Sequence, residues 1–314
     1  MSADDTPRIL VTGAAGQVGS ELWRCLADMS GVRFATREDM DLSDADNVRK
    51  FVREARPHLV INAAAYTAVD RAESDADMAM AVNGLAPLVM AEEMHALGGA
   101  MIQISTDYVF DGEKRAAYVE SDAPNPLSIY GKSKLAGELA VSAACPAHWT
   151  LRTSWVFGIS GGNFLKTVLR VAETRDTMRV VADQRGAPTS ARGLAEMIVA
   201  MLELGRRPSG AALVARVAES AGVYHVTPQG ATTWHEYAYH IVQRLHQTRP
   251  ERAWSLQLER IEAIDTASYP TPARRPQNSL LDHDKLARRF HLRLPAWQTD
   301  VDACLDELLD IRCG

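Results

Sequence analysis

The sequence has 314 residues, of which 34 are Lys or Arg and 40 are Asp or Glu, so its formal net charge is −6. Hydrophobic residues make up 46% and charged residues 24%, which indicates a globular protein and excludes a disordered chain. The apolar runs are too short to span a membrane, the polar N-terminus does not resemble a secretory signal, and the mild acidity argues against a nucleic-acid partner.

Strand and helix patterns alternate along the first half of the chain. Short apolar runs predict strands over 8–12, 32–35, 59–63 and 101–105. Helical periodicity predicts helices over 17–27, 45–56, 75–97 and 130–144, and Ser43 is the predicted cap of the second. Because apolar strands that alternate with helices are buried on both faces, this half predicts an α/β fold with a Rossmann-type doubly wound parallel sheet.

The strict alternation weakens after about residue 158. The elements expected there are a strand over 150–156, helices over 163–175 and 193–204, a proline-rich irregular loop over 267–281, and an amphipathic helix after Pro295. We therefore expect a dinucleotide-binding domain over 1–158 and a smaller α/β substrate-binding region mainly over 159–314. The boundary is expected to be interleaved, with return segments around 190–225.

Cysteine and histidine spacing gives no sign of a metal site. Cys25, Cys145, Cys304 and Cys313 lie far apart and form no CxxC pair. They are typical of reduced thiols in a cytoplasmic protein, without a disulfide framework. The HExxH spacing is also absent, so no metal is expected in the chemistry.

A glycine-rich loop lies between the first predicted strand and the first predicted helix. Its glycines, Gly13, Gly16 and Gly19, have GxxGxxG spacing. In such a loop the first glycine allows the tight turn, the second lets the backbone approach a pyrophosphate, and the third permits close packing of helix on strand. The free amides at the start of the helix, where Gln17 and Val18 lie, favour phosphate charge. The loop predicts dinucleotide binding.

A tyrosine and a lysine are spaced four residues apart at the start of the helix over 130–144. Tyr130 and Lys134 therefore share one helix face, and an ammonium near a phenol lowers the phenol pKa toward the range in which proton exchange is feasible. The pair lies downstream of a strand that ends at Ser105, where the functional edge of a doubly wound sheet is expected. We predict that this pair is catalytic.

The order of these motifs resembles that of the extended short-chain dehydrogenase/reductases. The resemblance includes the glycine loop, residues 62–65 and 105–110, and the Tyr130-x-x-x-Lys134 pair. Within that family the chain looks most like the dTDP-4-dehydrorhamnose reductases, on the blocks 67–73, 152–157, 183–189 and 269–276. The resemblance covers nearly the whole chain. It implies NAD(P)H-dependent reduction of the C4 keto group of dTDP-4-dehydro-L-rhamnose to dTDP-L-rhamnose, a precursor of cell-surface polysaccharide.

The resemblance also implies roles for individual residues. Tyr130 would protonate the C4 oxygen, Lys134 would hold the nicotinamide ribose, and Thr106 would hydrogen-bond the carbonyl. The substrate would contact Asp107 and Tyr108 after Thr106, and Trp155 would pack against the deoxysugar. The Arg274–Arg275 pair would suit the nucleotide diphosphate. The remaining coenzyme contacts that it implies are Asp41 and Leu42 at the adenine, and Ala63, Ala64, Ala65 and Thr67 near the ribose and phosphates.

The coenzyme preference is predicted from the end of the second strand. An acid there would bind the ribose 2′-hydroxyl of NAD, whereas an arginine accommodates the 2′-phosphate of NADP. The chain has Arg37 at this position and no acid before Glu38. We therefore expect a preference for NADPH, with NADH still usable.

Two other functions remain open at this stage. A nucleotide-sugar epimerase or dehydratase of the same fold would retain its coenzyme through a redox cycle, whereas a reductase consumes it. A non-catalytic regulatory subunit related to the family would not need Thr106, Tyr130 and Lys134 intact.

The assembly expected from the sequence is a monomer or a weak homodimer. Some members of the family pair through acidic residues bridged by magnesium. Glu21 matches one such position, but Arg192 stands at the other, and a positive charge there would repel a cation.

Overall fold

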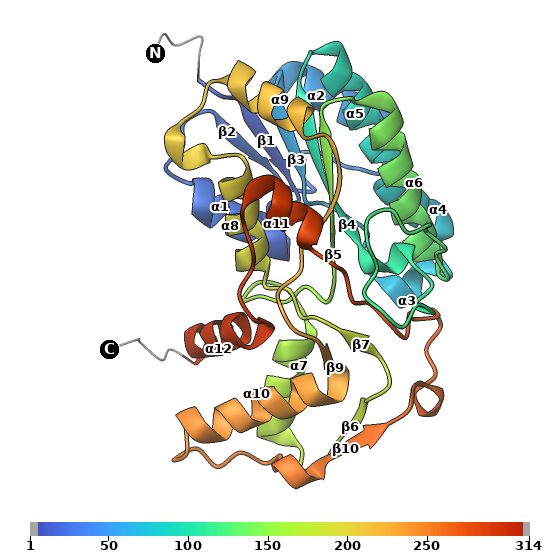
Figure 1. Ribbon diagram of the computed structural model, residues 1–314, viewed down its shortest axis with the longest axis vertical. Helices are drawn as coiled ribbons and strands as arrows, with labels where there is room; N and C mark the ends of the chain where they lie inside the picture. Colours follow the sequence, from blue (N-terminus) through green and yellow to red (C-terminus); the bar gives the residue numbers. More distant parts are fainter. Residues whose placement is uncertain (1–5, 310–314) are drawn as a thin grey trace.

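The computed structural model describes residues 6–309, and its larger part is built on a parallel sheet (Figure 1). The six strands lie in the order β2 (Val32–Ala35), β1 (Ile9–Thr12), β3 (Leu59–Asn62), β4 (Ala100–Thr106), β5 (His148–Thr153) and β8 (Gly222–His225). The strand order reverses at β1, which pairs with β2 on one side and β3 on the other. The predicted Rossmann-type sheet is confirmed, and the carboxyl ends of its strands form the edge where such folds bind ligands.

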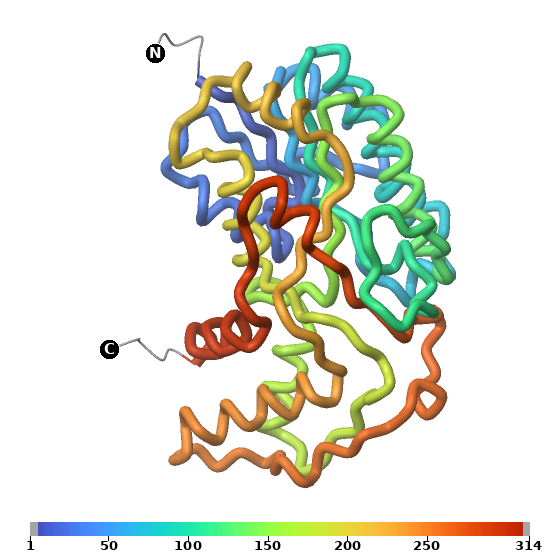
Figure 2. The backbone as a smooth tube through the Cα atoms, viewed as in Figure 1, coloured from blue at the N-terminus to red at the C-terminus, as the bar shows by residue number. Residues whose placement is uncertain are grey.

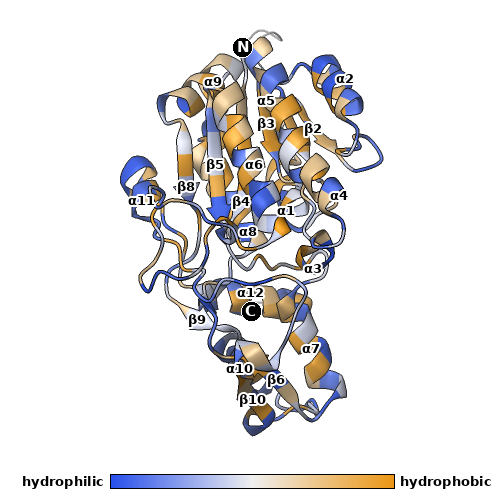
Figure 3. Cartoon of the chain, turned by 90° about the vertical axis from the view of Figure 1, so that its right-hand side faces the viewer, coloured by the Kyte–Doolittle hydropathy of each residue, from blue (hydrophilic) through white to orange (hydrophobic). Residues whose placement is uncertain are grey.

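Helices cover both faces of this sheet. One face carries α1 (Gln17–Leu26), α8 (Ala191–Met201) and α9 (Gly210–Glu219); the other carries α2 (Ala45–Ala55), α5 (Ala86–Ala96) and α6 (Ile129–Ala144). The short helices α3 (Val69–Ala72) and α4 (Ala76–Met80) precede α5, and a π-helical segment, Ala81–Leu85, joins α4 to it. Figure 3 shows hydrophobic residues along the central strands, as expected for a sheet buried on both faces.

The cap of α2 differs from the prediction. Asp44, not Ser43, is the N-cap, and its carboxylate accepts hydrogen bonds from the backbone N–H groups of Asp46 and Asn47 at 3.0 and 3.1 Å. The Ser43 hydroxyl instead donates to Asp41 at 2.8 Å. The helix begins at Ala45, and Asp44, directly before it, has the extended backbone from which a side chain reaches the first-turn amides.

The remaining elements form a smaller part around a second hydrophobic core. Three helices, α7 (Phe164–Thr174), α10 (Trp234–Thr248) and α12 (Trp297–Leu308), pack with β6 (Met178–Val181), which is parallel to β10 (Ile261–Ile264). β7 (Arg185–Gly186) is antiparallel to β9 (Thr232–Thr233). Single 3₁₀ turns lie at Leu258–Arg260 and Thr266–Ser268 in this part, and at Asp107–Val109 and Leu204–Arg206 in the larger part. In residues 6–309 no helix has the length and apolar character needed to cross a bilayer.

The chain passes between the two parts more than once (Figure 2). After β7 it returns to the sheet with α8, α9 and β8, then leaves again for β9 and α10. It comes back with α11 (Asp284–Phe290), where Phe290 packs against the core of the large sheet. We propose an interleaved domain boundary for this reason, with α11 as a further return segment.

Candidate active site

A pocket of about 880 Å³ lies at the carboxyl edge of the large sheet. It is lined by the glycine loop after β1, the segments that follow β2, β3, β4 and β5, the start of α6, and Trp234 from the smaller part. Its volume is in the range of small-molecule and cofactor sites. All of the predicted site residues except Gly19, Arg274 and Arg275 line it.

The glycine loop has the geometry that the sequence predicts. Gly13 has a φ of +68°, and a Cβ atom there would lie 2.7 Å from the Cα atom of Ala64. Gly16 is the N-cap of α1 and lines the pocket together with Gln17 and Val18. Gly19 lies outside the pocket lining, because it packs so closely on the Gly13 carbonyl that no side chain would fit. Its role is helix packing, not contact with a ligand.

Buried polar side chains tie the first strands together beneath this loop. The Thr12 hydroxyl donates to the Asn62 carboxamide at 2.5 Å, and Asn62 donates to Gln103 at 2.8 Å. Thr12 Oγ1 also accepts from the backbone N–H of Ala64 at 3.3 Å. This network holds the segment after β3 against the glycine loop, which brings Ala63, Ala64, Ala65 and Thr67 into the pocket wall.

The segment after β2 presents the Arg37 cation to the pocket, and its acids Asp39 and Asp41 accept hydrogen bonds from neighbouring residues. Arg37 is exposed and lines the pocket. The neighbouring carboxylate of Asp39 accepts hydrogen bonds from the backbone N–H and the hydroxyl of Thr36, at 2.8 and 2.7 Å, which lower its pKa. Asp41 and Leu42 line the pocket farther on, and Ser43 donors likewise lower the pKa of Asp41.

Tyr130 and Lys134 lie in the first two turns of α6. Ser128 caps this helix by accepting from the Gly131 N–H at 3.1 Å, and close packing of Gly131 on the Tyr108 carbonyl sets the helix against the end of β4. Lys134 is buried, and its Nζ donates to the carbonyl of Ile104 at 2.6 Å. Both side chains line the pocket beside Thr106.

The pKa of Tyr130 is shifted in the direction opposite to the prediction. Burial raises the pKa of Tyr130 above its ordinary value, a hydrogen bond with Thr106 opposes this rise, and the Asp107 charge adds to it. The pKa of Tyr130 is therefore raised where the sequence predicts it to be lowered, because desolvation is the largest cause. A phenol with a raised pKa is neutral at pH 7 and carries the proton that a general acid donates.

Burial also shifts the two charged neighbours of this phenol. It lowers the pKa of Lys134 to about 8, with the Glu138 charge acting in the opposite direction, so the ammonium form predominates at pH 7 and is lost above about pH 8. It raises the pKa of Asp107 to about 6. The Asp107 carboxylate accepts from the Thr106 hydroxyl at 3.0 Å, and the Tyr108 ring packs edge-on against Tyr130 with centroids 5.4 Å apart.

Two stacked tryptophans form the wall toward the smaller part. The ring centroids of Trp155 and Trp234 are 3.7 Å apart, and the angle between the ring planes is 14°. Trp155 has a φ of +50°, which ends β5 at Thr153 instead of the predicted residue 156. A Cβ on Gly186 would lie 2.5 Å from the Trp155 ring, so this glycine makes room for the stack. Trp234 gave no sequence signal, since it approaches Trp155 only through the tertiary fold.

The arginine pair lies outside the pocket lining, although Arg275 interacts with Tyr108, which lines the pocket. Arg275 forms a two-pronged ion pair with Asp70 of α3, at 3.0 and 2.8 Å, and neither Arg274 nor Arg275 lines the pocket. This ion pair holds the loop over 269–276 against α3. Other lining residues that the sequence analysis missed are Tyr66, Arg71, Gly161 and Gly162. In residues 6–309 no cluster of His, Cys, Asp and Glu is arranged to hold a metal.

Comparisons of the sequence and of the structure with known proteins point to the same family. The family described as RmlD substrate binding domain matches residues 7–310. The chain is 45% identical to a dTDP-4-dehydrorhamnose reductase of Burkholderia thailandensis, over 96% of this chain and 99% of the relative, and 40% identical to that of Shigella flexneri, over 96% and 97%. A crystal structure of the Bacillus anthracis dTDP-4-dehydrorhamnose reductase in complex with NADP is similar, with a TM-score of 0.83, 31% identity, and 96% and 99% of the chains covered.

The reversed strand order, the glycine loop and the Tyr130–Lys134 pair at one pocket define an NAD(P)H-dependent oxidoreductase of the extended short-chain dehydrogenase/reductase class. The match to the relatives extends through the smaller part as well as the sheet. The chain belongs to the dTDP-4-dehydrorhamnose reductase family.

Proposed function

We propose that the protein reduces the C4 keto group of dTDP-4-dehydro-L-rhamnose with NADPH to give dTDP-L-rhamnose, a precursor of cell-surface polysaccharide. One observation carries the proposal: Thr106, Tyr130 and Lys134 line one pocket in a chain that matches reductases of this name over nearly its whole length. Free thiols at Cys25, Cys145 and Cys304 support a cytoplasmic location, whereas Cys313 lies outside the described residues.

The residues around the glycine loop fit a dinucleotide. Gly13 and Gly16 leave the backbone open to a pyrophosphate at the N-terminus of α1, and Ala63, Ala64, Ala65 and Thr67 lie beside it. Asp41 and Leu42 would contact the adenine. Lys134 would hydrogen-bond the nicotinamide ribose, which requires its ammonium to turn from the Ile104 carbonyl or share that bond.

The reaction needs a hydride at C4 and a proton at O4. NADPH, when bound, supplies the hydride. Tyr130 donates its phenolic proton to O4. Thr106, once its hydroxyl turns from Asp107, donates a hydrogen bond to the same oxygen and stabilises the charge that develops there. Asp107 and Tyr108 are positioned to contact the sugar beyond Thr106. The stacked Trp155 and Trp234 rings offer an apolar wall to the deoxysugar.

The test is incubation of the protein with NADPH and the 4-keto sugar nucleotide. A reductase consumes one NADPH per product, seen as a stoichiometric loss of nicotinamide absorbance, and NMR identifies the C4 configuration. Turnover without loss of NADPH would instead indicate an epimerase or dehydratase. No turnover, with coenzyme still bound, would indicate a regulatory subunit.

Arg37 is expected to bind the 2′-phosphate of NADPH and so to distinguish it from NADH. Replacing Arg37 by Asp should raise KM for NADPH by about tenfold or more, because a hydrogen bond to a charged group is lost and a like charge is introduced. KM for NADH should barely change. The control is Arg115→Asp, which makes the same change in net charge at an exposed position outside the pocket. Equal effects of Arg37→Asp on both coenzymes would contradict this role.

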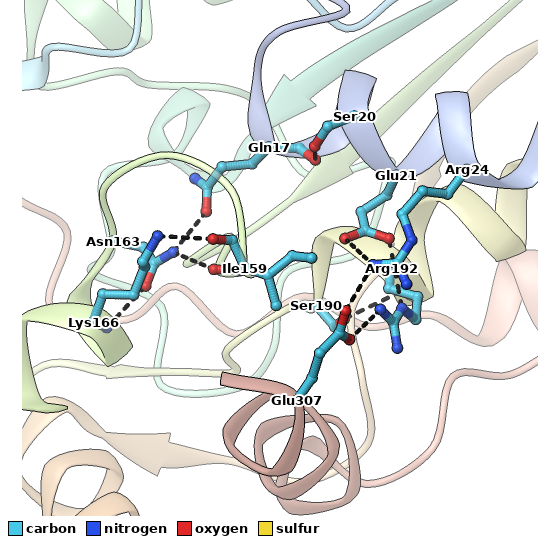
Figure 4. Close-up of polar contacts among 12 residues, drawn as sticks. Gln17, Ser20, Glu21, Arg24, Ile159, Asn163, Lys166, Ser190, Arg192 and Glu307 are labelled. Atoms are coloured by element: carbon cyan, nitrogen blue, oxygen red, sulfur yellow. Dashed lines mark hydrogen bonds and ion pairs between the residues drawn. The ribbon is translucent and has the colours of Figure 1, made fainter. Parts of the chain in front are cut away.

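The assembly proposed is a monomer or weak homodimer that needs no bridging cation. Arg192 of α8 forms ion pairs within its own chain, to Glu21 of α1 at 3.5 Å and to Glu307 of α12, and Arg24 pairs with Glu307 at 2.9 Å (Figure 4). These carboxylates are neutralised by guanidinium groups, so they do not fit a divalent cation. Light scattering should give the same mass with magnesium and with EDTA; an EDTA-sensitive dimer would refute this.

A further inference from the structure

One polar contact joins the coenzyme pocket to the smaller part of the molecule. The carboxamide of Gln17, at the start of α1, accepts a hydrogen bond from Asn163 Nδ2 at 3.0 Å (Figure 4). Gln17 lines the pocket, whereas Asn163 lies behind it as the N-cap of α7. The two residues are 146 positions apart in the sequence, so this contact exists only in the folded chain.

The other hydrogen bonds of Asn163 determine which way both carboxamides face. Asn163 Oδ1 accepts from the backbone N–H of Lys166 at 3.0 Å, as the helix cap requires. Its Nδ2 group must then face the other side, where it donates to the Gly158 carbonyl at 2.8 Å and to Gln17. Because a donor faces Gln17, its oxygen turns toward Asn163 and its Nε2 group points away, as Figure 4 shows.

The loop around this contact also holds the Gln17 side chain. A Cβ on Gly161 would lie 3.2 Å from Gln17 Cγ, so the glycine backbone packs directly on its methylene groups. Lys166 fixes the loop by donating from Nζ to the carbonyls of Ile159 and Gly161 at 2.7 and 2.9 Å. Gly161 and Gly162 line the same pocket as Gln17.

We propose that Asn163 is a positioning residue for coenzyme binding: it orients the Gln17 carboxamide so that the Nε2 group donates to the coenzyme pyrophosphate. Among residues 6–309, the side-chain hydrogen bond of Gln17 is the one that its oxygen accepts from Asn163, and its Nε2 group is open to the pocket. A pyrophosphate at the N-terminus of α1 would lie beside Gln17. The inference rests on the proposed coenzyme site and assigns it a contribution from the smaller part.

The test is a double-mutant cycle between Asn163→Ser and Gln17→Ala, with Kd measured for NADPH, NADH and 2′-AMP. Serine keeps the cap of α7 but is too short to reach Gln17. Asn163→Ser should raise Kd for NADPH and NADH alike by about fivefold, the effect of a weakened hydrogen bond. Kd for 2′-AMP, which has no pyrophosphate, should not change. In the Gln17→Ala background, Asn163→Ser should have no further effect.

Three results would overturn the proposal. Equal weakening by Asn163→Ser in both backgrounds would mean that Asn163 does not act through Gln17. Weaker binding of 2′-AMP would indicate a general distortion of the pocket. Unchanged binding of NADPH in either single variant would show that the contact does not serve the pyrophosphate. Failure of the coenzyme site itself would be seen separately, as an unsubstituted protein that binds neither NADPH nor 2′-AMP.

Discussion

Replacing Tyr130 by Phe is expected to lower kcat by ~10²–10⁴-fold while the protein stays folded, because the variant loses the acid that protonates the C4 oxygen. Phenylalanine keeps the ring that packs against Tyr108. The coenzyme Kd should therefore remain close to that of the unsubstituted protein. Single-turnover oxidation of NADPH with the 4-keto sugar nucleotide measures the chemical step directly, and equilibrium titration measures coenzyme binding.

Lys134→Ala provides the comparison for this prediction. It should lower turnover and also weaken coenzyme binding, since Lys134 is proposed to hold the nicotinamide ribose. A kcat near that of the unsubstituted protein in Tyr130→Phe would rule out Tyr130 as the acid. An unchanged coenzyme Kd in Lys134→Ala would rule out the ribose contact.

The second large effect is expected from a buried ion pair behind the candidate site. Arg152 of β5 donates to the Glu138 carboxylate of α6 at 2.6 to 3.2 Å, and both side chains are only 4% exposed. The Ser105 hydroxyl, directly before Thr106, also donates to Glu138. Arg152→Met should lower the free energy of unfolding by about 3–5 kcal/mol, because the buried Glu138 carboxylate loses its direct ion pair and keeps only the Ser105 hydroxyl and the Lys134 charge as compensation. Urea unfolding measures the loss.

The double variant Arg152→Met with Glu138→Gln tests the cause of that loss. If the cost comes from an unpaired buried charge, removing both charges should recover most of the stability. A double variant no more stable than Arg152→Met would point instead to lost packing, such as the contact of the Arg152 guanidinium with the Phe110 ring, 5.0 Å from its centroid.

The sequence alone was sufficient for features that depend on neighbouring residues. The glycine spacing predicts the turn at Gly13, which has a φ of +68°, and the packing of Gly19 on Gly13, because both depend on the backbone within this loop. The Tyr130–Lys134 spacing predicts a shared helix face, since a helical turn brings such residues together. Apolar runs that alternate with helices predict the parallel sheet, and the comparisons confirm that fold and the family.

Only the tertiary structure decided which charged and aromatic side chains meet across the molecule. Arg275 pairs with Asp70, 205 positions away, a contact that no motif in the sequence indicates. Trp234 joins Trp155, and Asn163 reaches Gln17, between elements that no local pattern relates. The pKa of Tyr130 is likewise raised mainly by burial, which spacing along the sequence does not show. Desolvation and long-range pairing depend on what the whole chain packs around a group, whereas sequence spacing determines only what lies within a turn or a strand of it.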